Sequence, residues 1–450
     1  MILSKQQIDN ILAAMPMSVQ QETVLDNIAE TIAGGELDFE TLQTHGLDYS
    51  LQQVLKQKIE EQRVVLKEKE ESELWDKCDE ENTVQAYDEY LSKFPNGKHA
   101  DRARRNKDRL IIDDNKHLYI DEIKQNINAY APDELAEKNI TLNDILNAGI
   151  TIPNVIQNIW GKERISLQFG DKTAAIPSGR TEIYFWGTTS SGKTCTLAAL
   201  LSRAKDLGLI QFLGGNGRLY MTQLSNIFKD GTAILPPGTS TGKNQALLCN
   251  LRDKQKNEHP LALIEIAGEI YKCFSRSVNN QHIKPEYKPA HDDLLEYLNS
   301  SNNPKYHFFI IDVSNDKIDK DGLSQIDYLT DAATYFSENN IFNNKTAGIS
   351  IIITKSDLLG NTEKEKGEQA IALLKKKYLN FVESLRSIAY KHKLIAKQSD
   401  MLDVYPFSIG TVYFKEMCIF NPQPSDKIIS ILQNNIAKTD TGNRWEFFNR

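Results

Sequence analysis

The sequence predicts an α/β domain with a mostly parallel sheet, preceded by an all-α region. From residue 181 onward, short apolar segments alternate with helix-like segments, as in a parallel sheet with helices on both faces. The first 160 residues carry helix-like patterns and no convincing strand pattern. The chain of 450 residues is long enough for two or three domains.

Composition disfavours several classes of function. A net charge of −8 argues against nucleic acid or an anionic membrane as the main partner. The chain has no apolar run of about 18 residues and no basic N-terminal segment leading into an apolar core, so neither a membrane span nor a signal peptide is expected. Its five cysteines are scattered, without a Cys-x-x-Cys pair, as in a reducing cytoplasm. We therefore expect a cytoplasmic protein.

Changes in charge density and in hydrophobic pattern along the chain predict four segments. These are a small helical module at 1–68, a helical hairpin at 69–115, a second small helical module at 116–165, and the α/β domain at 175–450. Within them, the charge-dense stretch 56–81 predicts a solvent-exposed connecting helix.

The expected hairpin is marked by a helix breaker. Pro95 and Gly97 end a helical pattern that carries Tyr90 and Leu91, and a second, basic helix is expected from His99. This segment resembles the helical hairpins related to tetratricopeptide repeats. The resemblance implies stacking and protein interaction, whereas a lone hairpin that acts as a spacer is the alternative.

A weak internal repeat brackets the hairpin. Residues 37–48 and 140–151 share the same order of capping residues and glycines. In the second copy, Thr141 and Asp144 have the spacing of a capping box, and Gly149 is expected to end the helix. Such modules usually bind other proteins, although helix caps alone would generate the same spacing.

The α/β region is predicted in more detail. Helices are expected after Gly192, Gly322, Glu363 and Ser425. The Gly-rich stretch 206–241 predicts mostly loop. The expected strands are Ile183–Trp186, Gln245–Leu251, Leu261–Ile266, His307–Val313, Ile349–Thr354 and Val404–Ser408.

Two further stretches of this region have no clear element. Gly238–Lys243 looks like a second phosphate loop, but it is one residue short and no strand precedes it. Tyr271–Lys305 is polar and interrupted by proline, which predicts a long insertion or a loop that contacts a partner.

Gly187–Thr194 reads Gly-Thr-Thr-Ser-Ser-Gly-Lys-Thr, a complete Walker A phosphate loop between a predicted strand and a predicted helix. Its backbone N–H groups are expected to hold the β-phosphate at the helix N-terminus. We expect Lys193 to contact the β- and γ-phosphates and Thr194 to bind Mg²⁺. The expected phosphate-binding residues are Gly187, Thr188, Thr189, Ser190, Ser191, Gly192, Lys193, Thr194 and Cys195.

A second acidic position is expected to complete the metal site. Glu265 lies in the apolar strand Leu261–Ile266, and Gly268 follows after two residues. This spacing predicts a carboxylate near Mg²⁺ and a backbone N–H near the γ-phosphate, as in a switch loop. A threonine before the preceding strand should contact both the metal and the γ-phosphate. Thr239 and Thr241 both qualify, and we favour Thr241.

Residues after a third apolar strand predict the base. Thr354 ends this strand, and Lys355 and Asp357 follow it. The Asp357 carboxylate can accept two hydrogen bonds from the N1–H and 2-amino groups of guanine, which adenine does not offer. The Lys355 stem can pack over the base, and the Ser408 backbone N–H is expected at the guanine O6. The predicted ligands are therefore GTP and GDP with Mg²⁺.

The order of these motifs resembles the translation-factor-related clade of P-loop GTPases over roughly residues 180–440. Within that clade, the chain is similar to the bacterial double-GTPase type of domain of predicted conflict and defence operons. Glu265 stands where the clade usually has Asp, and Thr354 where it usually has Asn. The segments that carry the resemblance are Tyr184–Gly187, Leu235–Thr239, Ala267–Glu269 and Phe407–Gly410.

The resemblance implies a GTP-operated switch or assembly protein. Protein partners are then expected on the helical N-terminal half, together with a nucleotide-dependent homodimer or larger assembly. An ATP-dependent signalling ATPase, for which Asp357 would be irrelevant, and a nucleotide-binding scaffold without turnover are the alternatives.

Catalysis is expected to be slow. Many GTPases orient the attacking water with Gln at the position of Glu269, and a carboxylate there repels the γ-phosphate. A partner or self-assembly should raise the rate. The expected catalytic residues are Lys193, Glu269 and Thr241. Candidates for a further positive charge at the γ-phosphate, chosen by their sequence position alone, are Arg218, Arg252 and Arg276.

Overall fold

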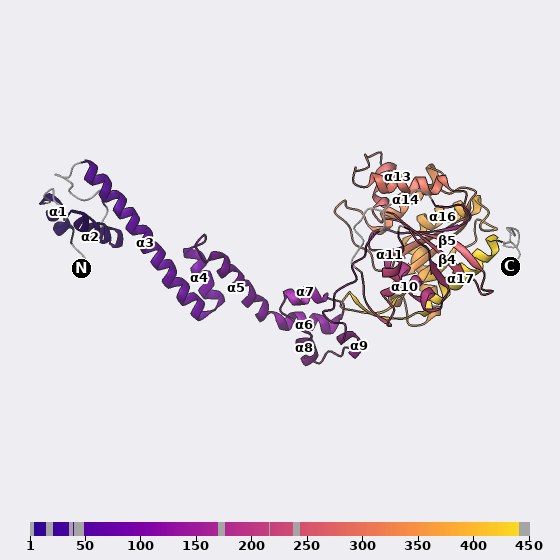
Figure 1. The fold of residues 1–450 in the computed structure, drawn as a ribbon, viewed down its shortest axis with the longest axis horizontal. Coiled ribbons are helices and arrows are strands. Elements are labelled where there is room, and N and C mark those ends of the chain that lie inside the picture. The colour runs from indigo at the N-terminus through magenta and orange to yellow at the C-terminus, as the bar shows by residue number, and fades with distance from the viewer. Residues whose placement is uncertain are drawn as a thin grey trace. The chain divides into compact units, whose positions relative to one another are not determined.

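The computed structural model describes residues 4–14, 21–35, 39, 49–169, 176–215, 217–236 and 244–440. The chain divides into two compact units, Met1–Asp121 and Glu122–Arg450 (Figure 1). The second small helical module that we expected therefore lies mostly in the same unit as the α/β domain. The finer division into four segments stays a prediction.

The described part of the first unit is helical. The connecting helix expected at 56–81 forms part of a helix of 33 residues, α3. The helices of this unit are α1 (Lys5–Ala13), α2 (Gln21–Gly34), α3 (Tyr49–Glu81), α4 (Val84–Lys93), α5 (Ala100–Asp114) and the first part of α6 (Lys116–Gln125).

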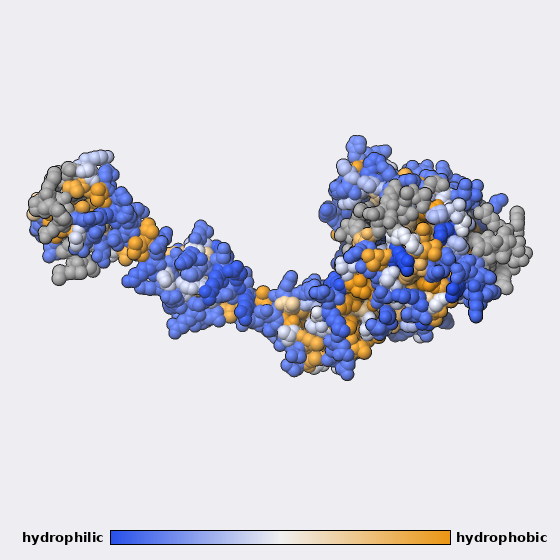
Figure 2. All heavy atoms as spheres, in the orientation of Figure 1, coloured by the Kyte–Doolittle hydropathy of each residue, from blue (hydrophilic) through white to orange (hydrophobic). Residues whose placement is uncertain are grey.

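Two separate apolar clusters stabilise the first unit. One joins α1 and α2 to the N-terminal part of α3, where Ile8, Ile28 and Leu55 are fully buried. The other joins the α4–α5 hairpin to the C-terminal part of α3 through residues that include Trp75 and Tyr90. The face of this hairpin that Figure 2 shows is mostly hydrophilic.

The predicted helical hairpin is present. Helix α4 ends at Lys93 and α5 begins at Ala100, on either side of the Pro95–Gly97 turn. The Tyr90 hydroxyl donates to Glu71 Oε1 over 2.5 Å and accepts from the His99 backbone N–H over 3.1 Å. A hairpin is thus confirmed, whereas its stacking as a tetratricopeptide-type repeat stays a prediction.

The second unit begins with three short helices, α7 (Pro132–Glu137), α8 (Leu142–Asn147) and α9 (Asn154–Gln157). Thr141 and Asp144 form the expected capping box at the start of α8. Gly149 has φ +79°, the left-handed conformation expected after the helix. The first copy of the proposed repeat, 37–48, lies almost wholly outside the described residues.

The α/β part of the second unit contains a seven-stranded sheet in the order β2-β4-β5-β1-β6-β7-β8. The pairs β1–β5, β1–β6, β6–β7 and β7–β8 are parallel, whereas β2–β4 and β4–β5 are antiparallel. All six predicted strands belong to this sheet. Its strands are β1 (Thr181–Trp186), β2 (Ile210–Phe212), β4 (Gln245–Arg252), β5 (Glu258–Glu265), β6 (Lys305–Asp312), β7 (Thr346–Thr354) and β8 (Asp403–Pro406).

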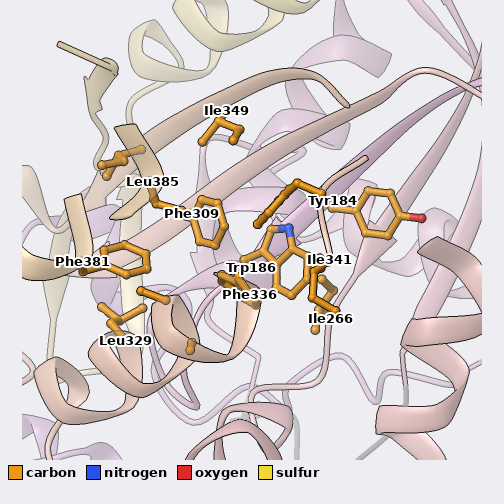
Figure 3. Packing of buried hydrophobic residues seen from close by; sticks show 14 of the residues in the cluster. Tyr184, Trp186, Ile266, Phe309, Leu329, Phe336, Ile341, Ile349, Phe381 and Leu385 are labelled. Carbon is orange, nitrogen blue, oxygen red and sulfur yellow. The ribbon is translucent and has the colours of Figure 1, made fainter. Parts of the chain in front are cut away.

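Helices cover both faces of the sheet because successive side chains of its strands point to opposite faces. On one face, Trp186 and Phe309 pack with helix α14 and α16 residues (Figure 3). On the other, Phe185 and Phe308 pack with α10 and α17 residues. The helices are α10 (Lys193–Asp206), α11 (Arg218–Asn226), α12 (Ile270–Val278), α13 (Lys288–Ser300), α14 (Gln325–Glu338), α15 (Glu363–Lys377), α16 (Leu379–Lys391) and α17 (Gln423–Asp440).

A second, three-stranded sheet has the order β3-β10-β9. Its strands are β3 (Thr232–Ile234), β9 (Gly410–Tyr413) and β10 (Met417–Phe420), and both pairings are antiparallel. It joins a segment before β4 to a hairpin that follows β8, so it connects parts of the chain that are far apart in sequence.

One loop prediction was wrong, and another missed three short elements. The stretch 206–241, expected to be mostly loop, contains β2, α11 and β3. The stretch 271–305, expected to be a long insertion or loop, forms most of α12 and all of α13. Glycine and proline misled both predictions, since the glycines lie between short elements and Pro289 stands in the first turn of α13, where proline is tolerated.

Among the described residues, no helix combines the length and the apolar character that a membrane crossing requires.

Candidate functional site

The phosphate loop lies where the sequence places it, between the end of β1 and the start of α10. Gly192 caps α10 with φ +89°, a left-handed conformation that glycine adopts without the steric cost of a side chain. At Gly187, a Cβ atom would lie 2.4 Å from Ser191 Oγ and 2.9 Å from the Ile310 carbonyl oxygen. The loop is therefore folded too tightly at Gly187 for a larger residue.

Lys193 lies inside this loop and is 5% exposed. Its Nζ donates to the carbonyl oxygens of Gly187 and Thr188, over 2.7 and 2.8 Å. Burial lowers the pKa of Lys193 to about 8, because desolvation of the ammonium outweighs the attraction of the Glu265 and Glu269 charges. An anion held by the loop would stabilise the charged form, which suits a polyphosphate ligand.

The two predicted metal-binding side chains are in direct contact. Thr194 Oγ1 donates to Glu265 Oε1 over 2.5 Å, so the longer Glu side chain does reach the phosphate loop. The Tyr220 hydroxyl of α11 donates to Glu265 Oε2 over 2.7 Å. Burial and the Glu265 carboxylate raise the pKa of Tyr220, which keeps this hydroxyl a donor.

These oxygen donors fit Mg²⁺, which prefers hard oxygen ligands and is usually bound by one or two protein groups together with phosphates and water. No cluster of three or more His, Cys, Asp or Glu side chains suited to a metal ion occurs in the part of the chain that is described. Phosphate oxygens and water would therefore have to supply the remaining ligands of an Mg²⁺ ion held by Thr194 and Glu265.

The predicted switch residues lie against the phosphate loop. A Cβ atom on Gly268 would lie 2.5 Å from the Thr189 nitrogen, so only glycine allows this close backbone approach. A cavity of about 570 Å³, the Glu269 pocket, opens beside this contact. Its lining includes Thr189, Ser190, Gly268, Glu269 and Gln325. Glu269 is thus next to the phosphate loop, as a residue that orients water would need to be.

The helix that follows Glu269 is tied to the loop after β6. On α12, Lys272 Nζ pairs with Asp319 at 3.0 Å and with Asp321 at 3.1 Å. The Phe274 ring of the same helix stacks on Tyr335 with ring centroids 4.5 Å apart. These contacts anchor α12, and Glu269 is the residue that directly precedes this helix.

A second cavity, of about 310 Å³, lies on the other side of the phosphate loop and is called the Asp357 pocket. Partial burial raises the pKa of Asp357, whose carboxyl lies in a short 3₁₀ turn after β7. The lining consists of Asn128, Gly192, Cys195, Thr196, Leu235, Thr354, Lys355, Asp357, Leu358, Phe407, Ser408, Ile409, Gly410, Val412 and Lys415. One carboxylate in a largely apolar pocket of this size suits a planar base that offers two donors.

Thr354 has a role that its position alone did not reveal. It is buried, and its Oγ1 donates to the Ser191 carbonyl oxygen over 2.8 Å. The end of β7 is thereby fastened to the phosphate loop. Lys355 Nζ lies 2.7 Å from Asp312 Oδ2 and 3.0 Å from Ser314 Oγ, so its stem crosses the region between the two pockets.

The structure thus brings most of the predicted site together. The exceptions are the switch threonine candidates Thr239 and Thr241, which lie outside the described residues, as does the phosphate-loop-like Gly238–Lys243. Arg252 pairs with Glu258 at the opposite end of the β4–β5 hairpin from Glu265, so it is not a local source of positive charge.

Three residues of the site were not predicted from the sequence. Tyr220 lies in the stretch expected to be loop, Asp312 ends β6 without a motif, and Asn128 comes from the helical region far upstream. Only Asp312 left a signal, because an acidic residue at the carboxyl end of a buried parallel strand lies at the ligand-binding edge of such sheets.

The sheet order, the antiparallel β4–β5 edge hairpin, the helices on both faces and the phosphate loop after β1 define the class of fold. The fold is that of a P-loop α/β domain of the GTPase type, preceded by an all-α region, as the sequence predicts.

No family model and no curated protein matches the chain. Among solved structures, the chain is similar to one named for nucleolar GTP-binding protein 1 from Plasmodium falciparum. The two are 12% identical, with a TM-score of 0.26, and the match covers 60% of this chain and 91% of the other. A TM-score this low carries no argument, so the assignment above depends on topology and motifs.

Proposed function

We propose that the chain is a GTP-binding and slowly GTP-hydrolysing molecular switch or assembly protein. The observation that carries the proposal is the pairing of two half-sites around one phosphate loop. The Thr194–Glu265 contact starts from this loop, and Gly192 and Cys195 of the same loop line the Asp357 pocket. A nucleoside triphosphate with a guanine base and a bound Mg²⁺ matches both.

Each residue then has a defined role. The backbone N–H groups of the loop and Lys193 bind the phosphates, and Lys193 exchanges two carbonyl partners for phosphate oxygens. Thr194 and Glu265 would hold Mg²⁺, which would supply positive charge beside the phosphates. Tyr220 keeps the Glu265 carboxylate aimed at the phosphate loop.

Slow turnover follows from Glu269. Glu269 lines a pocket beside the loop and can accept a proton or a hydrogen bond from water. Its negative charge, however, is repelled by the negative charge of the γ-phosphate. Two of the candidate arginines have other acidic partners: Arg252 pairs with Glu258, and Arg276 lies beside Asp321. A partner or a second copy of the chain would supply the missing charge.

Guanine is favoured over adenine by Asp357. Its carboxylate can accept hydrogen bonds from both N1–H and the 2-amino group, whereas adenine presents an acceptor at N1. The Lys355 stem is positioned by its contacts with Asp312 and Ser314, where it can cover one face of the base.

Nucleotide binding and turnover test the proposal directly. The full chain should bind GDP far more tightly than ADP, and Asp357→Ala should abolish that preference while Asp206→Ala, a change at an exposed aspartate of α10, should not. GTP turnover should be lost in Lys193→Ala. Equal affinity for GDP and ADP would support an ATPase instead, and tight GDP binding without any turnover would support a scaffold.

The wider role is also part of the proposal. We place the protein in the cytoplasm, in a bacterial defence or conflict system, with protein partners on the helical N-terminal half. A nucleotide-dependent homodimer or larger assembly fits a slow GTPase that needs an added charge. Light scattering with GDP and with a non-hydrolysable GTP analogue should reveal a change in mass, and an unchanged mass would contradict nucleotide-dependent assembly.

A further inference from the structure

The short helical module of the second unit, defined here as residues 122–165, is attached to the turn of the β9–β10 hairpin. Phe414, in this turn, is fully buried, and its ring meets Trp160 edge-on with centroids 4.9 Å apart. The Phe414 backbone N–H donates to the Ile127 carbonyl oxygen over 3.3 Å. The contact therefore combines an aromatic pair, in which the Phe414 ring is fully buried, with a backbone hydrogen bond.

Asn128 makes a two-sided contact with the same turn. Its Nδ2 donates to the Val412 carbonyl oxygen over 3.1 Å, and its Oδ1 accepts from the Lys415 backbone N–H over 3.0 Å. One side chain thus bridges the two ends of the turn. Lys415 Nζ also pairs with Glu134 of the module, at 2.8 Å.

The turn has a conformation that needs such support. Phe414 and Lys415 have φ of +53° and +60°, a left-handed region that costs residues with side chains free energy. Two successive residues of this kind persist only where neighbouring groups hold them. The helical module supplies those groups through Ile127, Asn128 and Trp160.

The hairpin held in this way is a wall of the Asp357 pocket. Ile409, Gly410, Val412 and Lys415 all line the pocket, and Asn128 lines it as well. A residue of the helical module is therefore both a brace of the hairpin and part of the cavity assigned to the base. A shift of the turn would change the shape of that cavity.

The hairpin also pairs with the segment that leads to the predicted switch threonines. Strand β10 pairs with β3, and the Leu235 backbone N–H donates to the Glu416 carbonyl oxygen over 2.6 Å. Glu416 is in turn an ion-pair partner of Arg164, from the helical module. The hairpin thus contacts the base pocket, the segment before the switch threonines and the helical module.

We propose that Asn128 is a positioning residue of the base pocket, through which the helical module 122–165 sets the affinity and the dissociation rate of the guanine nucleotide. This inference rests on the proposed function of the same site. The coupling free energy between two contacts acts equally in both directions. The nucleotide must then stabilise the docked module as much as the module stabilises the bound nucleotide. A protein that binds the module and displaces it would act as an exchange factor.

The test compares Asn128→Ala with Asn147→Ala, which changes an exposed asparagine of α8 in the same module. Affinities of the full-length variants for GDP and for inorganic pyrophosphate are measured, together with the dissociation rate of a fluorescent GDP. Pyrophosphate contacts the phosphate loop but leaves the base pocket empty. A general loss of folding would weaken both ligands, whereas a loss confined to the base pocket would weaken GDP alone.

We expect Asn128→Ala to weaken GDP binding by about fivefold to thirtyfold, the range for one or two lost hydrogen bonds, with faster dissociation and pyrophosphate binding within about twofold of wild type. GDP affinity equal to that of Asn147→Ala, or a parallel loss for both ligands, would overturn the inference. A wild-type protein that binds pyrophosphate but not GDP would instead refute the proposed function.

A second variant keeps the test valid if Asn128→Ala does not fold. Glu134→Gln removes the ion pair with Lys415 but retains an oxygen that can accept from the Ala131 backbone N–H, as Glu134 does at 2.7 Å. A smaller loss, of about twofold to threefold in GDP affinity, with unchanged pyrophosphate binding, is expected for a single exposed pair. An unchanged dissociation rate of GDP in this variant would count against the inference.

Discussion

Thr194 and Glu265 share a hydrogen bond of 2.5 Å across the phosphate loop, and Tyr220 holds the second oxygen of the same carboxylate. The clade that the sequence resembles usually has the shorter Asp at this position. A longer side chain has more rotamers, so it needs a fixed partner to aim it. Tyr220 provides that partner from a helix that the sequence did not predict.

Tyr220→Phe should therefore weaken Mg²⁺ binding without removing the carboxylate. We expect the Mg²⁺ concentration needed for half-maximal GTP binding or turnover to rise about tenfold, the lower end of the effect seen when a group that orients a metal ligand is lost. GDP binding in the presence of EDTA should stay unchanged. Tyr49→Phe, at a residue 77% exposed, is the control. Equal Mg²⁺ dependence in Tyr220→Phe and wild type would show that Glu265 is held without Tyr220.

Gly268→Ala should separate binding from turnover. Its Cβ atom would meet the Thr189 backbone at 2.5 Å, so the switch turn has to move away from the phosphate loop. We expect GTP turnover to fall at least about tenfold, or about 1.4 kcal/mol of barrier, while GDP affinity changes little. Single-turnover assays and GDP titrations measure the two effects, and unchanged turnover would show that Gly268 does not need to approach Thr189 during hydrolysis.

Gly367→Ala is the matched glycine control, because a Cβ atom there would meet no heavy atom within 4 Å. Gly367 lies inside α15, where glycine is less favourable than alanine. The substitution should raise the free energy of unfolding by about 0.5–1 kcal/mol and leave turnover unchanged. Thermal or denaturant unfolding measures the gain, and a loss of stability would contradict the helical environment of this residue.

Lys193 should make nucleotide binding depend on pH in a defined direction. The protein's own groups leave Lys193 with a pKa of about 8, whereas an unfolded lysine titrates near 10.4. Between these values the unfolded chain binds more protons, so this residue alone makes stability rise with pH from about 8 to about 10.4. The negative charge of bound phosphates should raise the pKa of Lys193 again. Binding of GDP between about pH 8 and about pH 10.4 should therefore be accompanied by uptake of a proton.

Calorimetry in buffers of different ionisation enthalpy measures that uptake. At about pH 8.5 we expect roughly half a proton or more per GDP, since Lys193 is then largely neutral before binding. At about pH 7 the uptake by Lys193 should vanish because the residue is already charged. No uptake at the higher pH would show that Lys193 keeps its proton through its two carbonyl partners.

Trp160 should report on the nucleotide through Phe414. The hairpin that lines the Asp357 pocket carries the Phe414 ring against Trp160, so a change of the pocket wall alters the surroundings of this indole. Intrinsic fluorescence should change on addition of GDP, and Trp160→Phe should remove most of the change. Trp75→Phe, in the first unit, should retain it. A response that persists without Trp160 would place the reporter elsewhere.

The strands and the phosphate loop could be predicted because their signals are local. The apolar runs of β1 and β5 to β7 are buried strands of a parallel sheet, and Gly192 and Lys193 have fixed places in the Walker A motif. Glu265 and Asp357 lie at the end of β5 and just after β7, since parallel strands bring their carboxyl ends to one edge of a sheet, whereas their roles stay predictions.

The missed features depend on contacts between distant parts of the chain. Tyr220 contacts Glu265 only because α11 packs against α10, and nothing next to Tyr220 in the sequence indicates this. Asn128 lies at the Asp357 pocket because it bonds to the β9–β10 turn, which is far away in the sequence. Glycine content misled the prediction for 206–241, because short elements separated by glycines have the composition of a loop.

Helix α3 has a consequence for protease sensitivity. Its two ends belong to different apolar clusters, and between Ile59 and Trp75 none of its side chains is buried. Helix propensity and side-chain charges are therefore the main support of the roughly three turns of backbone before Glu71, which bonds Tyr90, and a helix of that length is marginal in water. Amide hydrogens there should exchange sooner than those at either end, and the lysines and Arg63 of this stretch should be the earliest tryptic cleavage sites within the helix.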